Sequence, residues 1–466
     1  MLEEGPVSAH VASPAALGSV PSDPVRALQH ALYRAAKADP GRRFHALWDK
    51  VLRRDVLWRA WVMVRRNNGA PGIDKTTLAE VEEYGVARLL DELAVDLRDG
   101  RYRPLPARRV FIPKPAQPGE YRPLSIPAVR DRIVQAACKI VLEPIFEADF
   151  LPCSFGFRPK RSAHDALQVL IDESWQGRRW VVETDIANCF EAIPKDELMR
   201  AVEERVCDRS VLKLLRAILR SGVMQDGQVR RPVTGTPQGG VVSPLLANVY
   251  LHRVDRAWDV RRHGVLVRYA DDAVVMCKSR QQAEAALERL RVLLAELGLE
   301  PKAAKTRIVH LQVGGDGFDF LGFHHRLVRS QGRVGAKGVT FLARWPAKKA
   351  MQHARDRIRE LTERRRLLLS VEWVVDDVNR FLRGWAAYFR YGNSADQFDK
   401  ISRYARMRLA LFVAKRHRRS REFGWYVVAF ASPNQLGLID LTGTVAAPRP
   451  FRAWRVTPNA GGERRR

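Results

Sequence analysis

Two apolar runs separated by a short polar stretch lie at 265–277, which reads Val-Leu-Val-Arg-Tyr-Ala-Asp-Asp-Ala-Val-Val-Met-Cys. Two valine-rich runs flanking a tight turn are typical of a β-hairpin. The turn holds Asp271 and Asp272. Neighbouring carboxylates between buried strands repel each other and lose hydration, so they need a cation. Mg²⁺ bound through oxygen ligands and substrate phosphates fits best. A solvated hairpin tip is the alternative interpretation of these residues taken alone.

Helical periodicity predicts further elements. The expected helical segments are 24–66, 78–97, 131–150, 195–219, 282–297 and 345–421. The first places Trp48, Trp58 and Trp61 on apolar faces, and a turn-forming run at 67–72 ends it. The segments at 131–150 and 282–297 are predicted to be amphipathic. A single strand is expected at 318–323.

An apolar stripe in the last helical segment is expected to pack into a core rather than to stack on bases. Its members are Val371, Val374, Val375, Val378, Phe381, Leu382 and Trp385. Arg380, Arg383 and Arg390 accompany the stripe.

The charge balance changes this picture, because the net charge is +28 in a 466-residue chain that is 46% hydrophobic. Such a composition indicates a folded protein with a polyanionic partner. From Arg326 onward, 31 Lys and Arg residues face 11 Asp and Glu residues. We therefore expect phosphate contacts from the cationic run at 415–421, although a merely solvated face is the usual meaning of such a run.

The length allows two to four domains. No apolar run is long enough to span a bilayer, and no signal pattern opens the chain. Five scattered cysteines without a Cys-x-x-Cys pair argue against a disulfide framework and a zinc site. We expect a reducing, cytoplasmic setting.

Three further stretches carry candidate chemistry. Lys114 and Arg122 punctuate a proline-rich extended stretch and could grip a triphosphate, although solvated charges on an edge hairpin are the alternative. Asp185 ends an apolar strand, where a lone aspartate is often a turn former but beside a second carboxylate pair becomes a candidate metal ligand. The glycines at 234–246 permit close backbone approach, and Gln238 offers a donor and an acceptor. That loop lacks a phosphate-loop lysine, so a nucleoside triphosphatase is disfavoured.

The order of these blocks resembles the reverse transcriptases and maturases encoded by bacterial group II introns, over roughly residues 45–425. The blocks are Ile-Pro-Lys-Pro at 112–115, Arg-Pro-Leu-Ser-Ile-Pro at 122–127, the Asp185 block, Gly-Thr-Pro-Gln-Gly-Gly-Val-Val-Ser-Pro-Leu at 235–245, Tyr-Ala-Asp-Asp, Lys305-Thr306 and Phe-Leu-Gly-Phe at 320–323. Ser-Phe-Gly-Phe-Arg-Pro at 154–159 and Leu-Arg-Gly-Trp-Ala-Ala-Tyr at 382–388 resemble two further signatures. The last belongs to a maturase domain that binds intron RNA in the family.

The resemblance implies an α+β fold. It predicts a right-hand polymerase, with fingers and a palm built on an antiparallel sheet, followed by an α-helical thumb/maturase (X) domain. The expected divisions are a loose N-terminal tail (1–40), an N-terminal extension of the fingers (41–105), fingers and palm (106–325), thumb and X domain (326–425) and a basic C-terminal tail (426–466). No cysteine follows Cys277 and no histidine follows His417, so the nuclease domain of many relatives is not expected.

The resemblance also implies the site residues. Asp185, Asp271 and Asp272 would be catalytic and, with Ile186, would hold two Mg²⁺ ions, one activating the primer 3′-hydroxyl and one neutralising the triphosphate. The dNTP-binding set would be Lys114, Arg122, Phe190, Gln238 and Lys305, with Phe190 as a steric gate against a ribose 2′-hydroxyl. The RNA-binding set would be Arg380, Arg383, Lys415, Arg416, Arg418 and Arg419. Where relatives commonly show two aromatics and an aspartate, this chain has Asn188-Cys189-Phe190-Glu191.

The implied function is an RNA-directed DNA polymerase that copies intron RNA during retromobility and assists intron splicing. Its partners would be group II intron RNA, an RNA template with a DNA primer, dNTPs and target DNA, without a membrane. Two alternatives stay open. One is an RNA-binding splicing cofactor whose polymerase is idle, and the other is a domesticated reverse transcriptase in phage defence or CRISPR adaptation.

Overall fold

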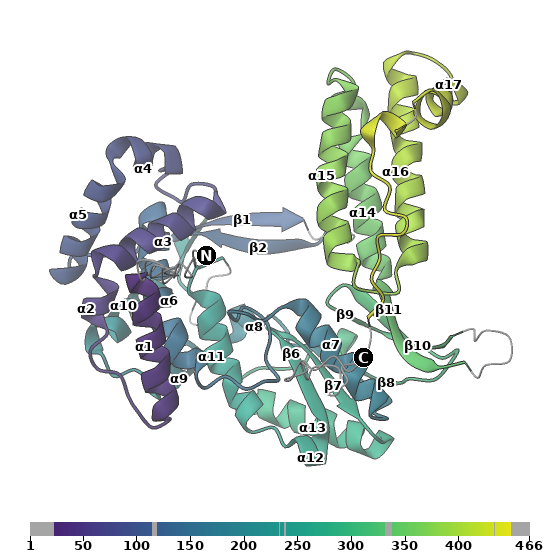
Figure 1. Ribbon diagram of the computed structural model, residues 1–466. Coiled ribbons are helices and arrows are strands. Elements are labelled where there is room, and N and C mark those ends of the chain that lie inside the picture. The colour runs from purple at the N-terminus through teal and green to yellow at the C-terminus, as the bar shows by residue number, and fades with distance from the viewer. Residues whose placement is uncertain are drawn as a thin grey trace, which may run out of the picture.

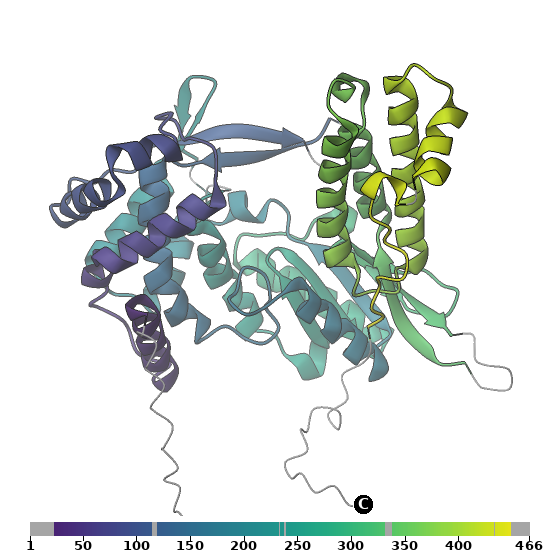
Figure 2. The same ribbon diagram turned by 45° about the horizontal axis from the view of Figure 1, so that its top comes forward.

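The computed structural model describes residues 23–113, 119–232, 234–236, 239–330, 338–432 and 434–448. Two predicted nucleotide contacts, Lys114 and Gln238, lie outside these ranges. Helices form the N-terminal end of the molecule, a strand-rich body lies in the middle, and a helical C-terminal region stands beside it (Figures 1 and 2). Among the described residues, none of the helices combines the length and the apolar character needed to cross a membrane.

Three of the N-terminal helices pack on one long buried helix. The helices of this end are α1 (Pro24–Ala38), α2 (Trp48–Val51), α3 (Arg54–Asn67), α4 (Leu78–Tyr84), α5 (Val86–Arg98) and α6 (Val129–Glu147). The expectation of an amphipathic helix at 131–150 is wrong, because 15 of the 19 residues of α6 are buried under α1, α2 and α3. The segment expected at 78–97 is interrupted at Gly85, whose φ of +103° suits glycine. Trp61 is buried, but Trp58 is exposed, contrary to its predicted apolar face.

A four-stranded sheet projects from this end toward the C-terminal helices (Figure 1). Its strands are β2 (Tyr121–Ile126), β1 (Ala107–Pro113), β4 (Val223–Gln225) and β5 (Gln228–Arg230), in that order. The β1–β2 pair is antiparallel and forms the projecting arm. The helices of the middle part of the chain are α7 (Ala163–Trp175), α8 (Cys189–Ala192), α9 (Lys195–Glu203), α10 (Arg209–Arg220), α11 (Ser243–Arg256) and α12 (Val260–His263).

The central sheet is antiparallel and is covered on both faces. Its strand order is β6 (Val265–Tyr269), β7 (Asp272–Cys277), β3 (Trp180–Asp185) and β8 (Arg307–His310). Because side chains alternate along a strand, Val182 and Val275 face the core that includes α11 and α13 (Arg280–Glu296). Val181 and Val274 face the core that includes α7 and the C-terminal helices. The predicted hairpin at 265–277 and the predicted amphipathic helix at 282–297 are confirmed.

The C-terminal region begins with a small sheet, β11-β10-β9, and continues as helices. The elements are β9 (Phe318–Phe320), β10 (Phe323–Arg329), β11 (Thr340–Pro346), α14 (Lys348–Leu361), α15 (Val371–Phe389), α16 (Ala395–Arg416) and α17 (Arg421–Trp425). The single strand expected at 318–323 is wrong, because Leu321 and Gly322, at φ +49° and +78°, form a two-residue hairpin turn.

Two expectations about the C-terminal helices have different outcomes. The apolar stripe of α15 packs into the core, as predicted, since Val374, Val378 and Leu382 are buried. The segment after residue 425 was expected to be a tail, yet Val428, Leu438 and Leu441 are buried in the same core. Residues 426–448 therefore complete the helical region, apart from residue 433, which lies outside the described ranges.

Candidate active site

The turn of the β6–β7 hairpin places two carboxylates at one end of the central sheet. Tyr269 pairs with Asp272, so Ala270 and Asp271 form a two-residue turn. Ala270 adopts the left-handed region, at φ +57°, as hairpin turns of this length require. The main-chain carbonyl of Asp271 accepts a hydrogen bond from the Ile186 N–H at 3.1 Å, which joins the turn to the end of β3.

The third predicted carboxylate lies beside the pair, because Asp185 stands opposite Asp272 in the antiparallel register of β3 and β7. On its other side, the carbonyl of Asp185 accepts a hydrogen bond from the Lys302 N–H at 2.7 Å. Lys305, in a 3₁₀ turn at Ala303–Lys305, extends its Nζ to Asp185 Oδ2 at 2.5 Å. The fold thus gathers three acids and one lysine that are up to 120 residues apart in the chain.

The electrostatics of this cluster are strongly perturbed. Burial, followed by the negative charges of Asp271 and Asp185, raises the pKa of Asp272 to about 7. Burial also raises the pKa of Asp271, and the positive charges of Lys305 and Arg122 oppose that rise. Desolvation lowers the pKa of Lys305, but its hydrogen bond to Asp185 and the nearby carboxylates raise it overall. The cluster carries more negative charge than its one lysine neutralises.

The donor set suits a hard cation, although it is not a preformed cage. Within the described ranges, no three or more His, Cys, Asp or Glu side chains converge as a group that could hold one ion. All donors are oxygens, which Mg²⁺ prefers, and Ile186 can offer only its main-chain carbonyl. The mutual repulsion that raises the pKa of Asp272 is what a divalent ion relieves, so the residues present fit Mg²⁺.

Two other predicted nucleotide-binding residues, Phe190 and Arg122, lie on different elements. Phe190 lies half-buried on α8, and its carbonyl accepts a hydrogen bond from the Thr236 N–H at 2.7 Å. Gly235, at φ +89°, allows that contact, since a Cβ there would stand 2.8 Å from the Glu191 Cα. Arg122 is exposed on β2, and its charge reaches the cluster, as its effect on the pKa of Asp271 indicates.

The predicted RNA-binding residues lie apart from the carboxylates, on the helical region. Arg380 and Arg383 are exposed on α15. Lys415, Arg418 and Arg419 are exposed around the end of α16. The guanidinium of Arg416 differs, because it donates to the carbonyls of Leu367, at 2.5 Å, and Leu369 and so ties down the α14–α15 connection.

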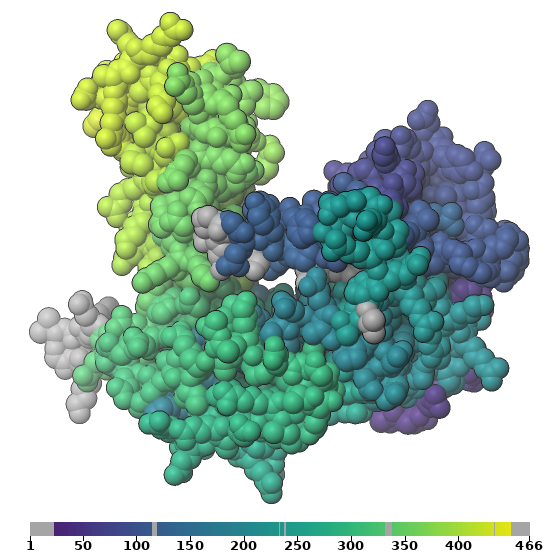
Figure 3. Space-filling view, turned by 180° about the vertical axis from the view of Figure 1, so that it is seen from behind, coloured from purple at the N-terminus to yellow at the C-terminus, as the bar shows by residue number. Residues whose placement is uncertain are grey.

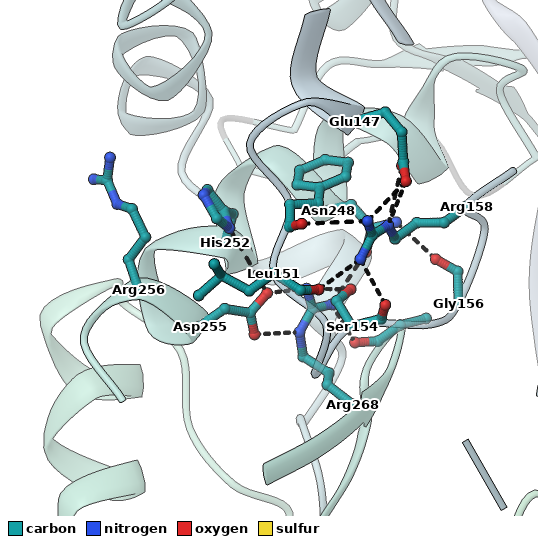
Figure 4. Close-up of polar contacts among 12 residues, drawn as sticks. Glu147, Leu151, Ser154, Gly156, Arg158, Asn248, His252, Asp255, Arg256 and Arg268 are labelled. Atoms are coloured by element: carbon teal, nitrogen blue, oxygen red, sulfur yellow. Dashed lines mark hydrogen bonds and ion pairs between the residues drawn. The ribbon is translucent and has the colours of Figure 1, made fainter. Parts of the chain in front are cut away.

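The polar residues behind the turn were not predicted from the sequence. Arg268, directly before Tyr269, is buried against Asp255, Asn248 and Ser154 (Figure 4). A signal was present, because a charged residue stood inside an otherwise apolar run of a predicted buried strand.

Comparison with known proteins agrees with this geometry. Residues 112–325 match the reverse transcriptase (RNA-dependent DNA polymerase) family, and residues 351–428 match the maturase-specific domain of group II introns. The chain is 37% identical to Protein YkfC of Escherichia coli (strain K12) over 355 residues, which cover 67% of this chain and 90% of that protein.

A second relative carries the intron in its name. The chain is 35% identical to the group II intron-encoded protein LtrA of Lactococcus lactis subsp. cremoris over 235 residues, which are 50% of this chain but only 38% of LtrA. An uncharacterized 91 kDa protein in the cob intron of Schizosaccharomyces pombe is 35% identical over 209 residues, 44% of this chain and 25% of that protein. The chain belongs to the group II intron reverse transcriptase and maturase family, whose enzymatic class is RNA-directed DNA polymerase.

Proposed function

We propose that this chain copies intron RNA into DNA at the Asp185–Asp271–Asp272 cluster and assists the splicing of its intron. The observation that carries the proposal is that Asp185, Asp271 and Asp272 stand at the same end of an antiparallel sheet, with a lysine bonded to Asp185. RNA binding alone needs no partly buried acid cluster, because burying like charges costs stability.

The arrangement supports the architecture of a right hand. In this proposal the central sheet is the palm, within residues 106–325, and β1–β2 belongs to the fingers, which residues 41–105 extend. Residues 326–425, together with the described part of 426–448 that packs into the same core, would form the thumb and X domain. Figure 3 shows the surface hollowed under the arm formed by β1 and β2, beside the helical C-terminal region. A template–primer duplex in this hollow would meet the carboxylate end of the sheet.

The residues of this chain would divide the work of nucleotide transfer. Two Mg²⁺ ions supply charge neutralisation and a more acidic primer 3′-hydroxyl when bound. Asp185, Asp271 and Asp272 would hold them, with the Ile186 carbonyl as a further oxygen donor. Lys305 would leave Asp185 and bind the incoming nucleotide. Arg122 would attract the triphosphate, and Phe190 would restrict the sugar.

The predicted contacts outside the described residues, Lys114 and Gln238, belong to the same proposal as a phosphate contact and a contact near the templating base pair.

The helical region would serve the maturase role. Its exposed arginines and lysines on α15 and around the end of α16 offer contacts to the phosphates of intron RNA. The match of residues 351–428 to the maturase-specific domain supports this assignment. Target DNA would be engaged in the same ribonucleoprotein when the intron inserts.

Primer extension tests the polymerase proposal directly. The full chain would be given an RNA template, a DNA primer, dNTPs and Mg²⁺, beside the variants Asp271→Ala and Asp91→Ala. Asp91 is a matched control, because it is an exposed carboxylate on α5 whose partner is Arg54. We expect extension by wild type and Asp91→Ala and none by Asp271→Ala. Extension that survives Asp271→Ala would overturn the catalytic assignment.

Splicing of the intron RNA by the same variants tests the second role. We expect Asp271→Ala to support splicing as well as wild type does, since the helical region is unaltered. Loss of both activities together would contradict the assignment of the two roles to separate surfaces.

A further inference from the structure

Behind the carboxylate turn lies a buried polar network that the nucleotide-transfer mechanism above does not use (Figure 4). Its centre is Arg268, the residue of β6 that precedes Tyr269, with only 2% of its surface exposed. A buried guanidinium is costly unless its charge is paired and its donors are satisfied. The hydrogen-bond partners of Arg268 therefore indicate its role.

Every donor of Arg268 is used. Its Nε and Nη2 donate to the two carboxylate oxygens of Asp255 at 2.8 and 2.5 Å, a bidentate ion pair. Nη2 also donates to Ser154 Oγ at 2.8 Å. Nη1 donates to Asn248 Oδ1 at 3.1 Å and to the main-chain carbonyl of Ala270 at 3.0 Å. A guanidinium has five N–H groups, and these five bonds account for all of them.

The bond to Ala270 is the one that reaches the active site. Ala270 holds a left-handed backbone at φ +57°, which is unfavourable for a non-glycine residue unless its surroundings hold it there. Its carbonyl is fixed from behind by Arg268, and the carbonyl of Asp271 is fixed by the Ile186 N–H. The two bonds together set the direction in which the turn presents its carboxylates.

The loop at 153–158 packs behind Arg268 and the turn and holds both in place. Its main chain brackets that of Arg268, since the Arg268 N–H donates to Cys153 and the Phe155 N–H donates to Arg268, at 2.8 and 2.9 Å. Gly156 lies against the turn so closely that a Cβ there would stand 2.5 Å from the Ala270 nitrogen and 3.0 Å from the Tyr269 carbonyl carbon. Only a glycine allows the loop to approach to this distance without moving backbone.

A second buried arginine holds the loop itself in shape. Arg158 pairs with Glu147, with Nη2 to Oε1 at 2.7 Å, and its Nη1 donates to the carbonyls of Leu151 and Ser154 at 2.6 and 2.7 Å (Figure 4). The segment Ser-Phe-Gly-Phe-Arg-Pro at 154–159 thus supports the turn that carries Asp271 and Asp272. We call the loop at 153–158 together with Arg268 the seat of this turn.

We propose that Arg268, held by Asp255 and Ser154 while Gly156 packs against the turn, is a positioning residue that orients the Asp271–Asp272 turn toward the bound metal ions and so sets the rate of nucleotide transfer. This inference rests on the proposed function of the carboxylates. Arg268 bonds the carboxylate of Asp255 rather than those of Asp271 and Asp272, so it acts on the turn through the backbone of Ala270.

The test compares substitutions that loosen the seat with matched substitutions elsewhere. Arg268→Lys keeps a positive charge for Asp255 but offers three donors in place of five. Arg205→Lys is its control, because Arg205 is also a buried arginine, 6% exposed, but it donates to the carbonyls of Ala36 and Pro40 and pairs with Asp149 instead of bonding the turn. Gly156→Ala alters the seat without touching a charge. Gly41→Ala is its control, since a Cβ there meets nothing closer than 3.4 Å.

We expect Arg268→Lys to lower the kcat of primer extension about 100-fold, because misplacement of reacting groups by about 1 Å is worth that factor. KM for dNTP should change by less than about twofold, since the nucleotide contacts stay in place. Gly156→Ala should lower kcat about tenfold by the same displacement. The controls Arg205→Lys and Gly41→Ala should keep the wild-type kcat, whatever they do to the melting temperature.

Metal binding gives a readout that is independent of catalysis. Mn²⁺ titrated into the protein and followed by electron paramagnetic resonance should bind at least about tenfold more weakly to Arg268→Lys than to Arg205→Lys, since outer residues that orient ligands are worth 10- to 100-fold in affinity. The part of the Mn²⁺ binding that is lost in Asp271→Ala is the part that comes from this site.

The outcomes separate the two proposals. If wild type does not extend a primer, the proposed function fails, and the Mn²⁺ comparison still decides whether Arg268 orients the turn. If wild type extends and Arg268→Lys matches Arg205→Lys in kcat and in Mn²⁺ affinity, the positioning role is overturned. An increase of KM with unchanged kcat would also overturn it, because a misaimed turn affects the chemical step.

Discussion

The carboxylate end of the central sheet and the helical C-terminal region handle charge in opposite ways. At the sheet, Arg268 is 2% exposed and fully bonded, and three partly buried carboxylates crowd together. On the helical region, α15 buries its apolar stripe and leaves Arg380 and Arg383 exposed. Buried charges are held in one geometry by their partners, whereas exposed charges stay free to meet a flexible polyanion.

This difference predicts how the two regions respond to substitution. Changes at the sheet should alter the rate of chemistry more than RNA affinity. Changes in the helical region should alter stability where the side chain is apolar, and RNA affinity where it is charged.

The largest effect is expected from Asp185→Asn. The change removes one negative oxygen ligand and weakens the bond with Lys305, so primer extension should fall by at least about 1,000-fold. Template–primer affinity, measured by filter binding, should match wild type. An extension rate within tenfold of wild type would place the metal site elsewhere.

A core substitution in the helical region comes next. Phe398 is completely buried beside Trp385, so Phe398→Ala should destabilise this region by about 3–5 kcal/mol. Hydrogen exchange along α15 and α16 measures the loss. The control Trp373→Ala alters a side chain that is 72% exposed and should cost less than about 0.5 kcal/mol. Equal losses from the two changes would contradict the packing described for α15.

Removal of exposed charge from the end of α16 should have a smaller effect. With Lys415, Arg418 and Arg419 all changed to Gln, the Kd for intron RNA should rise about tenfold, and the dependence of log K on log salt should become shallower by about two. Arg416 is left unchanged because it bonds the backbone of the α14–α15 connection. Primer extension at saturating RNA should be unaltered.

The matched control removes three exposed arginines from the N-terminal helices, Arg26, Arg34 and Arg66. We expect a weaker effect on RNA affinity from these, because the excess of positive charge lies mainly after residue 326. If both triple variants lose affinity equally, the helical region is not the principal RNA platform.

The smallest predicted effect is a pH-dependent gain of stability from Asp272→Asn. Folding raises the pKa of Asp272 from 3.8 to about 7, so the folded state binds more protons than the unfolded state between these values. The free energy of unfolding of wild type therefore falls as pH rises through this window. That of Asp272→Asn does not, because asparagine does not titrate. Without divalent ions, the melting temperature should rise by a few degrees at pH 8 and hardly change at pH 4. An equal rise at both pH values would contradict a titrating carboxylate.

The sequence supported the local elements well. The β6–β7 hairpin, the strand that ends at Asp185 and the amphipathic helix α13 all lie where their apolar patterns placed them, because each pattern reports which face of a local element is buried. The amphipathic expectation failed for α6, which is enclosed on nearly all sides by helices from distant parts of the chain. The hairpin at Leu321 and Gly322 was missed, since alternation alone does not distinguish one strand from two.

The candidate site also has features that the sequence predicted and features that only the structure shows. The identities of Asp185, Asp271 and Asp272 followed from motifs and their order along the chain. The sequence could not show that Lys305 bonds Asp185, that Arg416 ties down a loop, or that Arg268 uses all five of its donors. These contacts join residues that are brought together only by the packing of separate elements.

The sequence by itself determined the family blocks, the main helices and the paired carboxylates, because local periodicity and short motifs are written in neighbouring residues. Tertiary structure alone decided which charges are buried and which are exposed. Burial depends on what the rest of the fold places around a side chain, and the cost of burying a charge is met only when partners such as Asp255 and Ser154 arrive from elsewhere in the chain.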